Sequence, residues 1–418
     1  MPNPFRALRI RNYRLWASGA LISNIGTWMQ RIAQDWIVLT ELTNRNATAV
    51  GIVMSLQFGP QLVLLPVTGY AADHFDRRKL VIATQTAMGL LALGLGLLTI
   101  THLVTLWEVY AFALTLGCVS AFDAPTRQAF VSDLVGEADL ANAVGLNSTS
   151  FNGARMIGPA IAGVLIGVIG AGWVFIVNAA SFVAVLISLA MIRLDPAVRH
   201  SEVLRHSRSS GQAPPKDPGL ARRFSSGFHY VGQHRDLQVV LTMLFLIGTF
   251  GLNFPIYIST MSVTVFKAGA SEYGLLTSTM AIGSVIGALL SARRIRPDIQ
   301  LLVMATAVFG VGCAIAALMP NYILFGLVLL GVGIFTQTFT TSANSYVQLS
   351  TDPAMRGRVI AIMMAIFAGG TPLGAPIVGW VADHYGPRWG LGVGSAAGVV
   401  ATAIGLVYLG RNKSNSSL

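Results

Sequence analysis

The sequence is poor in charged residues: Asp, Glu, Lys and Arg make up only 11% of its 418 positions, against roughly 25% in soluble domains. So few charges cannot cover the surface of a globular protein of this length. Hydrophobic residues make up 54% of the chain, and the mean hydropathy is +0.65. This balance excludes a soluble globular protein and indicates an integral membrane protein.

Cysteine is also scarce, because only Cys118 and Cys313 are present, each inside an apolar run. Two isolated cysteines predict neither a disulfide framework nor a thiolate metal site. The chain has no H-E-x-x-H pair for a metal ion and no G-x-x-x-x-G-K-S/T loop for ATP. We therefore predict no enzyme, no metal site and no cofactor.

Long apolar runs dominate what is present. A bilayer core needs about 20 apolar residues per helix, and continuous runs exclude the alternation of a membrane β-barrel. The sequence therefore predicts an all-α membrane protein with twelve spanning helices. The predicted spans are 15–40, 48–72, 80–100, 104–127, 140–168, 172–192, 237–262, 272–292, 300–319, 322–348, 357–382 and 388–410.

The one long polar stretch, 193–236, separates two groups of six spans. We predict an N-terminal six-helix bundle over 1–192, a cytoplasmic linker over 193–236 and a C-terminal six-helix bundle over 237–418. The middle of the linker is rich in Ser, Pro and Gly, as flexible connections are. Its end, FSSGFHYV, is compatible with a short helix at the membrane interface.

The distribution of basic residues predicts the orientation. The net charge is +11, which in a soluble protein would suggest a nucleic-acid partner. Here the N-terminal arm, alternate loops and the C-terminal tail together hold 22 of the 28 Lys and Arg residues. The positive-inside rule then places both termini in the cytoplasm. We expect a multi-pass protein of a bacterial inner membrane, a monomer with the lipid bilayer and a small molecule as partners and no nucleic acid.

Two stretches of the chain resemble each other. GYAADHFDRR, residues 69–78, follows the second span, and GWVADHYGPR, residues 379–388, ends the eleventh. The predicted topology puts them on opposite sides of the membrane. Recurrence every three helices with alternating sidedness is typical of inverted three-helix repeats. We therefore expect 3+3 inverted repeats within each half.

The loop after the second span resembles a motif of the major facilitator superfamily, G-x-x-x-D-R/K-x-G-R-R/K. Its glycine, aspartate and arginine pair are Gly69, Asp73, Arg77 and Arg78, whereas His74 stands where Arg or Lys is usual and Asp76 replaces the second glycine. The resemblance covers nearly the whole chain, and it implies the twelve-helix fold of that superfamily and transport by alternating access.

The resemblance also implies roles for the motif residues. Asp73 would cap the N-terminus of the eleventh helix, where backbone N–H groups favour an anion. Arg77 would pair with Asp123 at the inner end of span four and close the cytoplasmic side. Alternatively, the arginines only set the topology. Asp123 and Arg127, four residues apart, are expected to form a structural pair.

Within that superfamily the stretches FRALRIRNYRLW, DAPTRQAFVSDLV and ARMIGPAIAG resemble drug and siderophore exporters, the transmembrane secretion effector group with the enterobactin and macrolide efflux proteins. The last stretch resembles the antiporter motif of exporters. Gly158 and Gly163 would let helix five approach a neighbour closely, and Pro159 removes a backbone donor and kinks the helix. We expect a deformable contact suited to a gate, with ordinary helix packing as the alternative.

Ionisable residues inside the spans are concentrated in the first half of the chain. Asn24, Trp28, Arg31 and Asp35 are spaced by four, three and four residues, which places them on one face of the first helix. Asp35 is the candidate proton carrier, because low dielectric favours a neutral carboxyl group whereas Arg31 favours the carboxylate. The alternative is a permanent Arg31–Asp35 ion pair. Glu108, near an interface, is a further candidate for proton coupling.

A second set of polar residues is predicted to line a substrate cavity. Each is a polar or cationic residue inside an apolar span, where an unpartnered polar group is costly, and each could instead stabilise packing. Three partners are compatible with Arg155: an anionic group of the substrate, Asp123 or Asp35. The candidates are Asn24, Trp28, Gln34, Gln57, Asn147, Arg155, Asn253, Gln337 and Asn344.

These observations favour a secondary active exporter that couples the efflux of an amphipathic small molecule, a drug or a siderophore-like compound, to the proton gradient. The alternative is an importer of a nutrient or a siderophore with the same fold. The sequence does not separate the two directions, since the resemblance of the span-five motif is the sole argument for export.

Overall fold

The structure, a computed structural model, describes residues 5–65, 67–68, 71, 75–193, 219–293 and 297–416. Its regular elements within these ranges are all helical, as the sequence predicts. The N-terminal half consists of η1 (Arg6–Arg9), α1 (Arg11–Ile37), η2 (Val38–Leu42), α2 (Ala47–Val63), α4 (Arg77–Ile100), α5 (Leu106–Leu134), α6 (Glu137–Ile169) and α7 (Ala171–Met191).

The C-terminal half repeats this plan. Its helices are α10 (Arg235–Leu246), η3 (Ile247–Gly251), α11 (Phe254–Thr260), η4 (Met261–Val265), α12 (Ala270–Ala292), α13 (Ile299–Leu318), α14 (Tyr322–Ser350), α15 (Arg356–Tyr385) and α16 (Pro387–Ser416). Each predicted span overlaps one long helix, which η2 continues in the first span, or, in the seventh, one helical series. Within the described ranges, ten helical segments are long and apolar enough to cross a bilayer, and α2 is a shorter apolar helix. With the more polar α1 they account for the twelve predicted spans.

The seventh span differs from the continuous helix expected over 237–262. The chain runs as α10 and η3, leaves the helical path at Leu252 and Asn253, and resumes as α11 and η4. Pro255 follows at once and lacks a backbone donor. The Asn253 side chain donates to the Thr249 carbonyl oxygen at 2.7 Å, which satisfies one of the carbonyl groups that the break leaves free.

The end of the predicted linker forms α9 (Gly219–Gln233), in agreement with the short helix expected there. It packs against α15, where Gly227 faces Arg358 and Ile362. Its position at a membrane interface stays a prediction, as does the division of the chain at residues 192 and 237.

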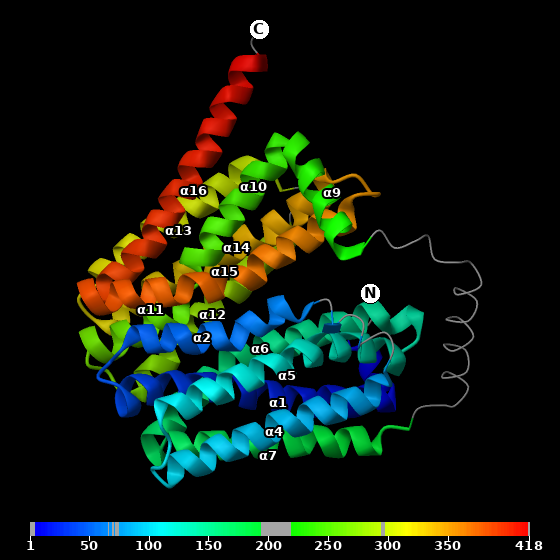
Figure 1. Ribbon diagram of the computed structural model, residues 1–418, viewed down its shortest axis with the longest axis vertical. Helices are drawn as coiled ribbons and strands as arrows, with labels where there is room; N and C mark the ends of the chain where they lie inside the picture. The colour runs from blue at the N-terminus through cyan, green and yellow to red at the C-terminus, as the bar shows by residue number, and fades with distance from the viewer. Residues whose placement is uncertain are drawn as a thin grey trace.

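The halves are stacked, with the N-terminal half below and the C-terminal half above in Figure 1. Within the N-terminal half, α1 packs on α6 and α7, α4 packs on α5 and α7, and α2 packs on α5. The principal contacts between halves join α2 to α15 and α6 to α12. We name the end of each helix by the predicted topology: cytoplasmic for the end with the N-terminus and outer for the opposite end.

Candidate functional site

A cavity of about 200 Å³ lies between the two halves. The N-terminal half contributes α1, α2 and α6 to its wall, and the C-terminal half contributes residues from Leu252 to α12 and one residue of α15. The lining residues are Trp28, Arg31, Ile32, Asp35, Met54, Gln57, Phe58, Arg155, Leu252, Phe254, Pro255, Ile258, Tyr273, Thr277, Met280, Ala281 and Thr371. An apolar wall with a few convergent polar groups is typical of a small-molecule site.

Two arginines share one aromatic ring in this wall. The Arg31 guanidinium carbon lies 4.5 Å from the centroid of the Trp28 ring, and the Arg155 carbon lies 5.8 Å from it. Arg31 also lies 5.3 Å from the Phe58 ring centroid. Such cation–π contacts fix the direction of a guanidinium group without neutralising its charge.

Asp35 contacts the opposite half of the protein. The Tyr273 hydroxyl of α12 donates a hydrogen bond of 3.0 Å to the Asp35 carboxylate of α1. The i, i+4 spacing allowed an ion pair between Arg31 and Asp35, but among the described residues the two form none. The carboxylate is directed to Tyr273, whereas the guanidinium group lies on Trp28, so the permanent pair, which was the alternative interpretation, is not formed.

The antiporter-like stretch of α6 packs on two helices at once. A Cβ atom at Gly158 would lie 2.7 Å from the Trp28 Cβ of α1, and one at Gly163 would lie 2.5 Å from the Ala270 carbonyl oxygen of α12. A Cβ atom at Gly274 of α12 would clash with the Pro159 carbonyl oxygen. The helix continues through Pro159 to Ile169. Gly158 therefore allows α6 to pack closely on α1, and Gly163 and Gly274 allow α6 and α12 to pack closely near their outer ends.

Asp383, the aspartate of the second ADH stretch, connects α15 to the outer end of α2 by hydrogen bonds. Its carboxylate accepts hydrogen bonds from the backbone N–H groups of Ala47, at 2.6 Å, and Thr48, at 2.8 Å. It also accepts one from the Thr48 hydroxyl, at 2.5 Å. An anion at a helix N-terminus satisfies free backbone donors and opposes the helix dipole. This contact closes the outer side together with the α6–α12 contact.

The cytoplasmic part of α6 lacks such neighbours. Cβ atoms at Gly145 and Gly153 would meet nothing within 4 Å, and Phe151 and Asn152 are exposed. In Figure 1 the halves lie closer together at their outer ends than at the end with the N-terminus and α9. The structure is thus closed on the outer side and diverges toward the cytoplasmic side.

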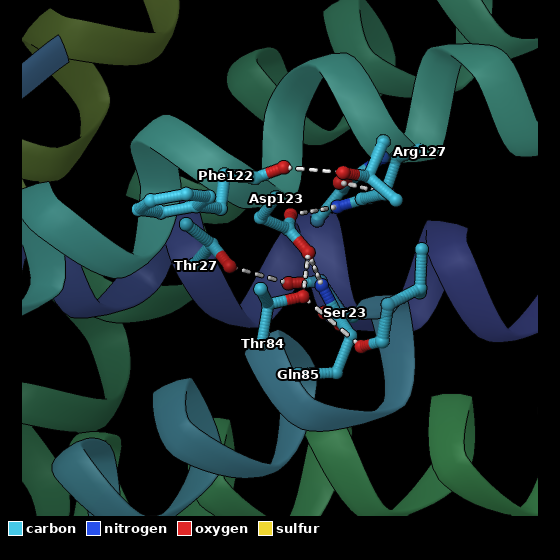
Figure 2. A network of polar contacts seen from close by, with 10 residues as sticks. Ser23, Thr27, Thr84, Gln85, Phe122, Asp123 and Arg127 are labelled. Carbon is cyan, nitrogen blue, oxygen red and sulfur yellow. Dashed lines mark hydrogen bonds and ion pairs between the residues drawn. The ribbon is translucent and has the colours of Figure 1, made fainter. Parts of the chain in front are cut away.

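A polar network within the N-terminal half surrounds Asp123 (Figure 2). The Asp123 carboxylate of α5 accepts hydrogen bonds from the Thr84 hydroxyl, at 2.7 Å, and the Gln85 amide, at 2.8 Å, both on α4. Arg127 lies 3.7 Å from the same carboxylate and donates to the Asn24 side-chain oxygen of α1 at 3.2 Å. The network ties three helices of one half together, which is a structural role.

The expected pair of Arg77 with Asp123 is not found. Arg77 instead forms an ion pair of 2.7 Å with Asp133. Arg77 is the first residue of α4. Asp123 of α5 lies beside Thr84, which is two turns further along α4. Because α4 and α5 run in opposite directions, the partner of Arg77 lies nearer the cytoplasmic end of α5.

The other motif residues have the following positions. Arg78 donates to the Leu189 carbonyl oxygen at 2.6 Å and so ties α4 to the end of α7. Gly69 and Asp73 lie outside the described residues, so the cap expected of Asp73 stays a prediction. Glu108 accepts a hydrogen bond of 2.6 Å from the Thr105 backbone N–H at the outer end of α5. This capping box accounts for an acidic residue there without a role in transport.

Three of the nine predicted cavity residues, Trp28, Gln57 and Arg155, line the cavity. The others lie elsewhere, and for these substrate contact stays a prediction. Asn24 binds Arg127, Gln34 is buried, Asn147 is half-buried on the cytoplasmic part of α6, Asn253 binds Thr249, Gln337 donates to Thr341, and Asn344 accepts from Gln348.

Sequence reasoning did not identify Tyr273, Phe58 or Asp383 as functional residues. For Asp383 a signal was present, because the repeated ADH stretch already places it in the position equivalent to Asp73. Tyr273 and Phe58 are aromatic residues in apolar spans, and such residues most often serve packing. They differ from ordinary packing residues because the approach of the two halves places them in the wall of the cavity.

Comparison with known proteins agrees with this architecture. A bacterial homologue of the human lysosomal transporter Spinster, in an inward-facing and unoccupied conformation, matches with a TM-score of 0.69 and 15% identity over 95% of this chain and 96% of that chain. A D-xylose–proton symporter matches with a TM-score of 0.71 and 10% identity over 96% and 97%. At such identities the likeness shows the fold alone.

Similar sequences cover almost the whole chain. The staphyloferrin A transporter of Staphylococcus aureus is 26% identical over 88% of this chain and 89% of its own length. The enterobactin exporter EntS of Escherichia coli is 24% identical over 89% and 85%. The model of the transmembrane secretion effector family matches residues 3–416. The chain is therefore a multi-pass membrane transporter and not an enzyme, and it belongs to the transmembrane secretion effector family of the major facilitator superfamily.

Proposed function

We propose that the protein is a secondary active exporter that moves an amphipathic, siderophore-like molecule out of the cell and is driven by the proton gradient. The names of two relatives, a staphyloferrin A transporter and an enterobactin exporter, support this substrate class. Two features of the molecule support alternating access: a cavity between the halves, and contacts that close it on one side only.

The observation that carries the proposal is the Tyr273–Asp35 hydrogen bond between the halves. Hydrogen bonds to an ionised acceptor are roughly twice as strong as those between neutral groups. Protonation of Asp35 therefore weakens a contact that helps close the outer side. Binding and release of a proton at Asp35 therefore change the stability of the outer closure, which couples proton movement to the change of conformation.

Membrane position and direction belong to the same proposal. The protein resides in the inner membrane as a monomer with both termini in the cytoplasm, and the diverging side of the structure takes up the substrate. An importer remains the alternative, and it uses the same cavity and carboxylate. The two are separated by the side from which substrate is taken up, compared in inverted and right-side-out vesicles.

The experiment is transport by purified protein in liposomes under an imposed pH gradient, against a panel of siderophores and lipophilic drugs. The proposal expects substrate-dependent proton movement for a siderophore-type compound, with substrate moving opposite to the proton. Proton movement in the same direction as the substrate would support the importer. Equal rates with and without the gradient would refute proton coupling.

A further inference from the structure

The cavity between the halves has an excess of positive charge. Among its lining residues, Arg31 and Arg155 are cationic and Asp35 is the one acidic group. The Asp35 carboxylate already accepts the Tyr273 hydrogen bond. A low-dielectric wall strengthens the field of such charges at the centre of the cavity. A ligand in this cavity therefore meets a net positive potential.

Neither cavity arginine is held in an ion pair, although the Asp35 carboxylate acts on the charge of Arg31 from a greater distance. Arg31 and Arg155 form no ion pair or hydrogen bond with the described residues, and the Arg31 Nε atom is buried without a partner. A buried donor that is left unsatisfied is costly, and an isolated charge more so. Because both arginines line the cavity, their other N–H groups can take an acceptor from outside the chain, a water molecule or a ligand.

A third arginine inside the spans, Arg127, has a structural role, and its contacts differ from those of the two cavity arginines. Arg127 has a carboxylate partner in Asp123 and an amide acceptor in Asn24. The arginine that holds helices together is thus paired, whereas the two that line the cavity are not. This contrast assigns the cavity arginines to a ligand rather than to packing.

The shared indole ring keeps the two guanidinium groups in one part of the cavity. Both guanidinium groups lie on the Trp28 ring, and stacking on the ring leaves the in-plane N–H groups of a guanidinium free to bind an acceptor. Carboxylates match the paired donors of arginine with two parallel hydrogen bonds. Phe58 and Phe254 line the same cavity and offer apolar contacts to the rest of the molecule.

We propose that the cavity binds an amphipathic anion, with a carboxylate held between Arg31 and Arg155 and an aromatic or apolar body against Phe58 and Phe254. This inference rests on the proposed transport function and specifies the charge of its substrate. A cationic substrate is disfavoured, because two unpaired guanidinium groups repel it and the one carboxylate is bound to Tyr273.

The test measures binding of three probes with the same ring and different charge: 1-naphthoate, 1-naphthamide and 1-naphthylmethylammonium. Equilibrium dialysis with the purified protein in nanodiscs gives the three dissociation constants. We expect naphthoate to bind about tenfold or more tightly than naphthamide, since a hydrogen bond to a charged group contributes on that order. The ammonium probe is expected to bind most weakly.

Variants assign the preference to the two arginines. Arg31→Gln with Arg155→Gln is expected to lower naphthoate affinity to the level of naphthamide, while naphthamide affinity stays unchanged and reports an intact cavity. The conservative variant Arg155→Lys keeps the charge and part of the preference. Arg235→Gln, which removes an exposed arginine outside the cavity, leaves all three affinities unchanged.

Three outcomes overturn the inference: equal affinity for naphthoate and naphthamide, tighter binding of the ammonium probe, or no binding of naphthoate at all. Retention of the naphthoate preference in the double variant overturns the assignment to these arginines. Because this test measures binding, a failure of proton-coupled transport in liposomes would not change the conclusion about the anion site. Conversely, proton-coupled transport of a cationic substrate would refute the anion site and would leave the proposed transport function standing.

Discussion

Tyr273 of α12 and Asp35 of α1 are joined by a hydrogen bond of 3.0 Å, although 238 positions separate them in the chain. Both residues lie near the outer ends of their helices, and both line the cavity between the halves. The strength of this bond depends on whether Asp35 is protonated. The bond also joins the two halves near the outer side, within the wall of the cavity.

We predict that Tyr273→Phe opens the outer side more often. The variant removes one hydrogen bond to a charged acceptor, which contributes about 1.5–3 kcal/mol, so the outward-open fraction rises roughly tenfold or more. The measurement is labelling of Thr277→Cys, a cavity position, by an impermeant thiol reagent applied to right-side-out vesicles. The background carries Cys118→Ala and Cys313→Ala, so that the introduced thiol is the only one.

The matched control is Tyr322→Phe, because Tyr322 lies exposed at the outer end of α14 and away from the cavity. It removes the same hydroxyl group and should leave labelling unchanged. Equal labelling rates for Tyr273→Phe and the parent protein would show that the hydrogen bond does not hold the outer side closed.

Asp383→Ala is predicted to act on the same closure through its contact with the N-terminus of α2. Loss of a side-chain acceptor at a helix N-terminus costs about 1 kcal/mol, with a range of about 0.5–2, and here the contact joins the two halves beside the N-cap residue Asn46. Labelling of Thr277→Cys from the outside should therefore rise about fivefold. Asp298→Ala is the control, since Asp298 caps α13 from within its own half by accepting from the Leu301 N–H at 2.8 Å. It should lower thermal stability similarly without a change in labelling.

Gly163→Ala should weaken the packing of α6 on α12. The new methyl group would lie 2.5 Å from the Ala270 carbonyl oxygen, and such overpacking costs about 1–3 kcal/mol. We expect a lower transport rate and more labelling of the cavity from the outside. Gly153→Ala lies in the same helix with nothing nearby, and it should be neutral or slightly stabilising because alanine favours the helix. If both variants behave alike, close packing at Gly163 has no role in closure.

Asp123→Ala is predicted to destabilise the protein rather than to uncouple it. Removal of the carboxylate leaves Arg127, Thr84 and Gln85 without their shared acceptor (Figure 2). Breaking a buried pair in this way costs about 3 kcal/mol or more. The midpoint of thermal unfolding in detergent should fall by several degrees, with a smaller fall for Asp123→Asn, which keeps an oxygen acceptor. An unchanged midpoint with lost transport would instead place Asp123 in the transport cycle.

The helices were predictable because their signal is local. The ends of spans such as 80–100 and 300–319 lie no more than three residues from the ends of α4 and α13, since the bilayer dictates both length and composition. The break of the seventh span is harder to predict, because Pro255 is compatible with a kink as well as with an interruption. Three residues of the polar face of α1, Trp28, Arg31 and Asp35, line the cavity, whereas Asn24 of the same face does not.

The partners of these residues were not predictable from spacing. Arg31 and Asp35 are correctly spaced for an ion pair, yet Tyr273 and Trp28 take their side chains in different directions. Arg77 finds Asp133 rather than Asp123, because the relative shift of α4 and α5 along their axes is a tertiary property. Spacing within one helix gives the face on which a residue lies, but not the residue that faces it.

The measurement that tests proton coupling most directly is transport by Asp35→Asn in liposomes, compared with the parent protein and with Glu108→Gln. We predict that Asp35→Asn exchanges labelled for unlabelled substrate across the membrane at a near-parent rate but no longer responds to an imposed pH gradient. Glu108→Gln should keep the response, because Glu108 caps α5. A full pH-gradient response in Asp35→Asn would contradict the assignment of Asp35 as the proton carrier.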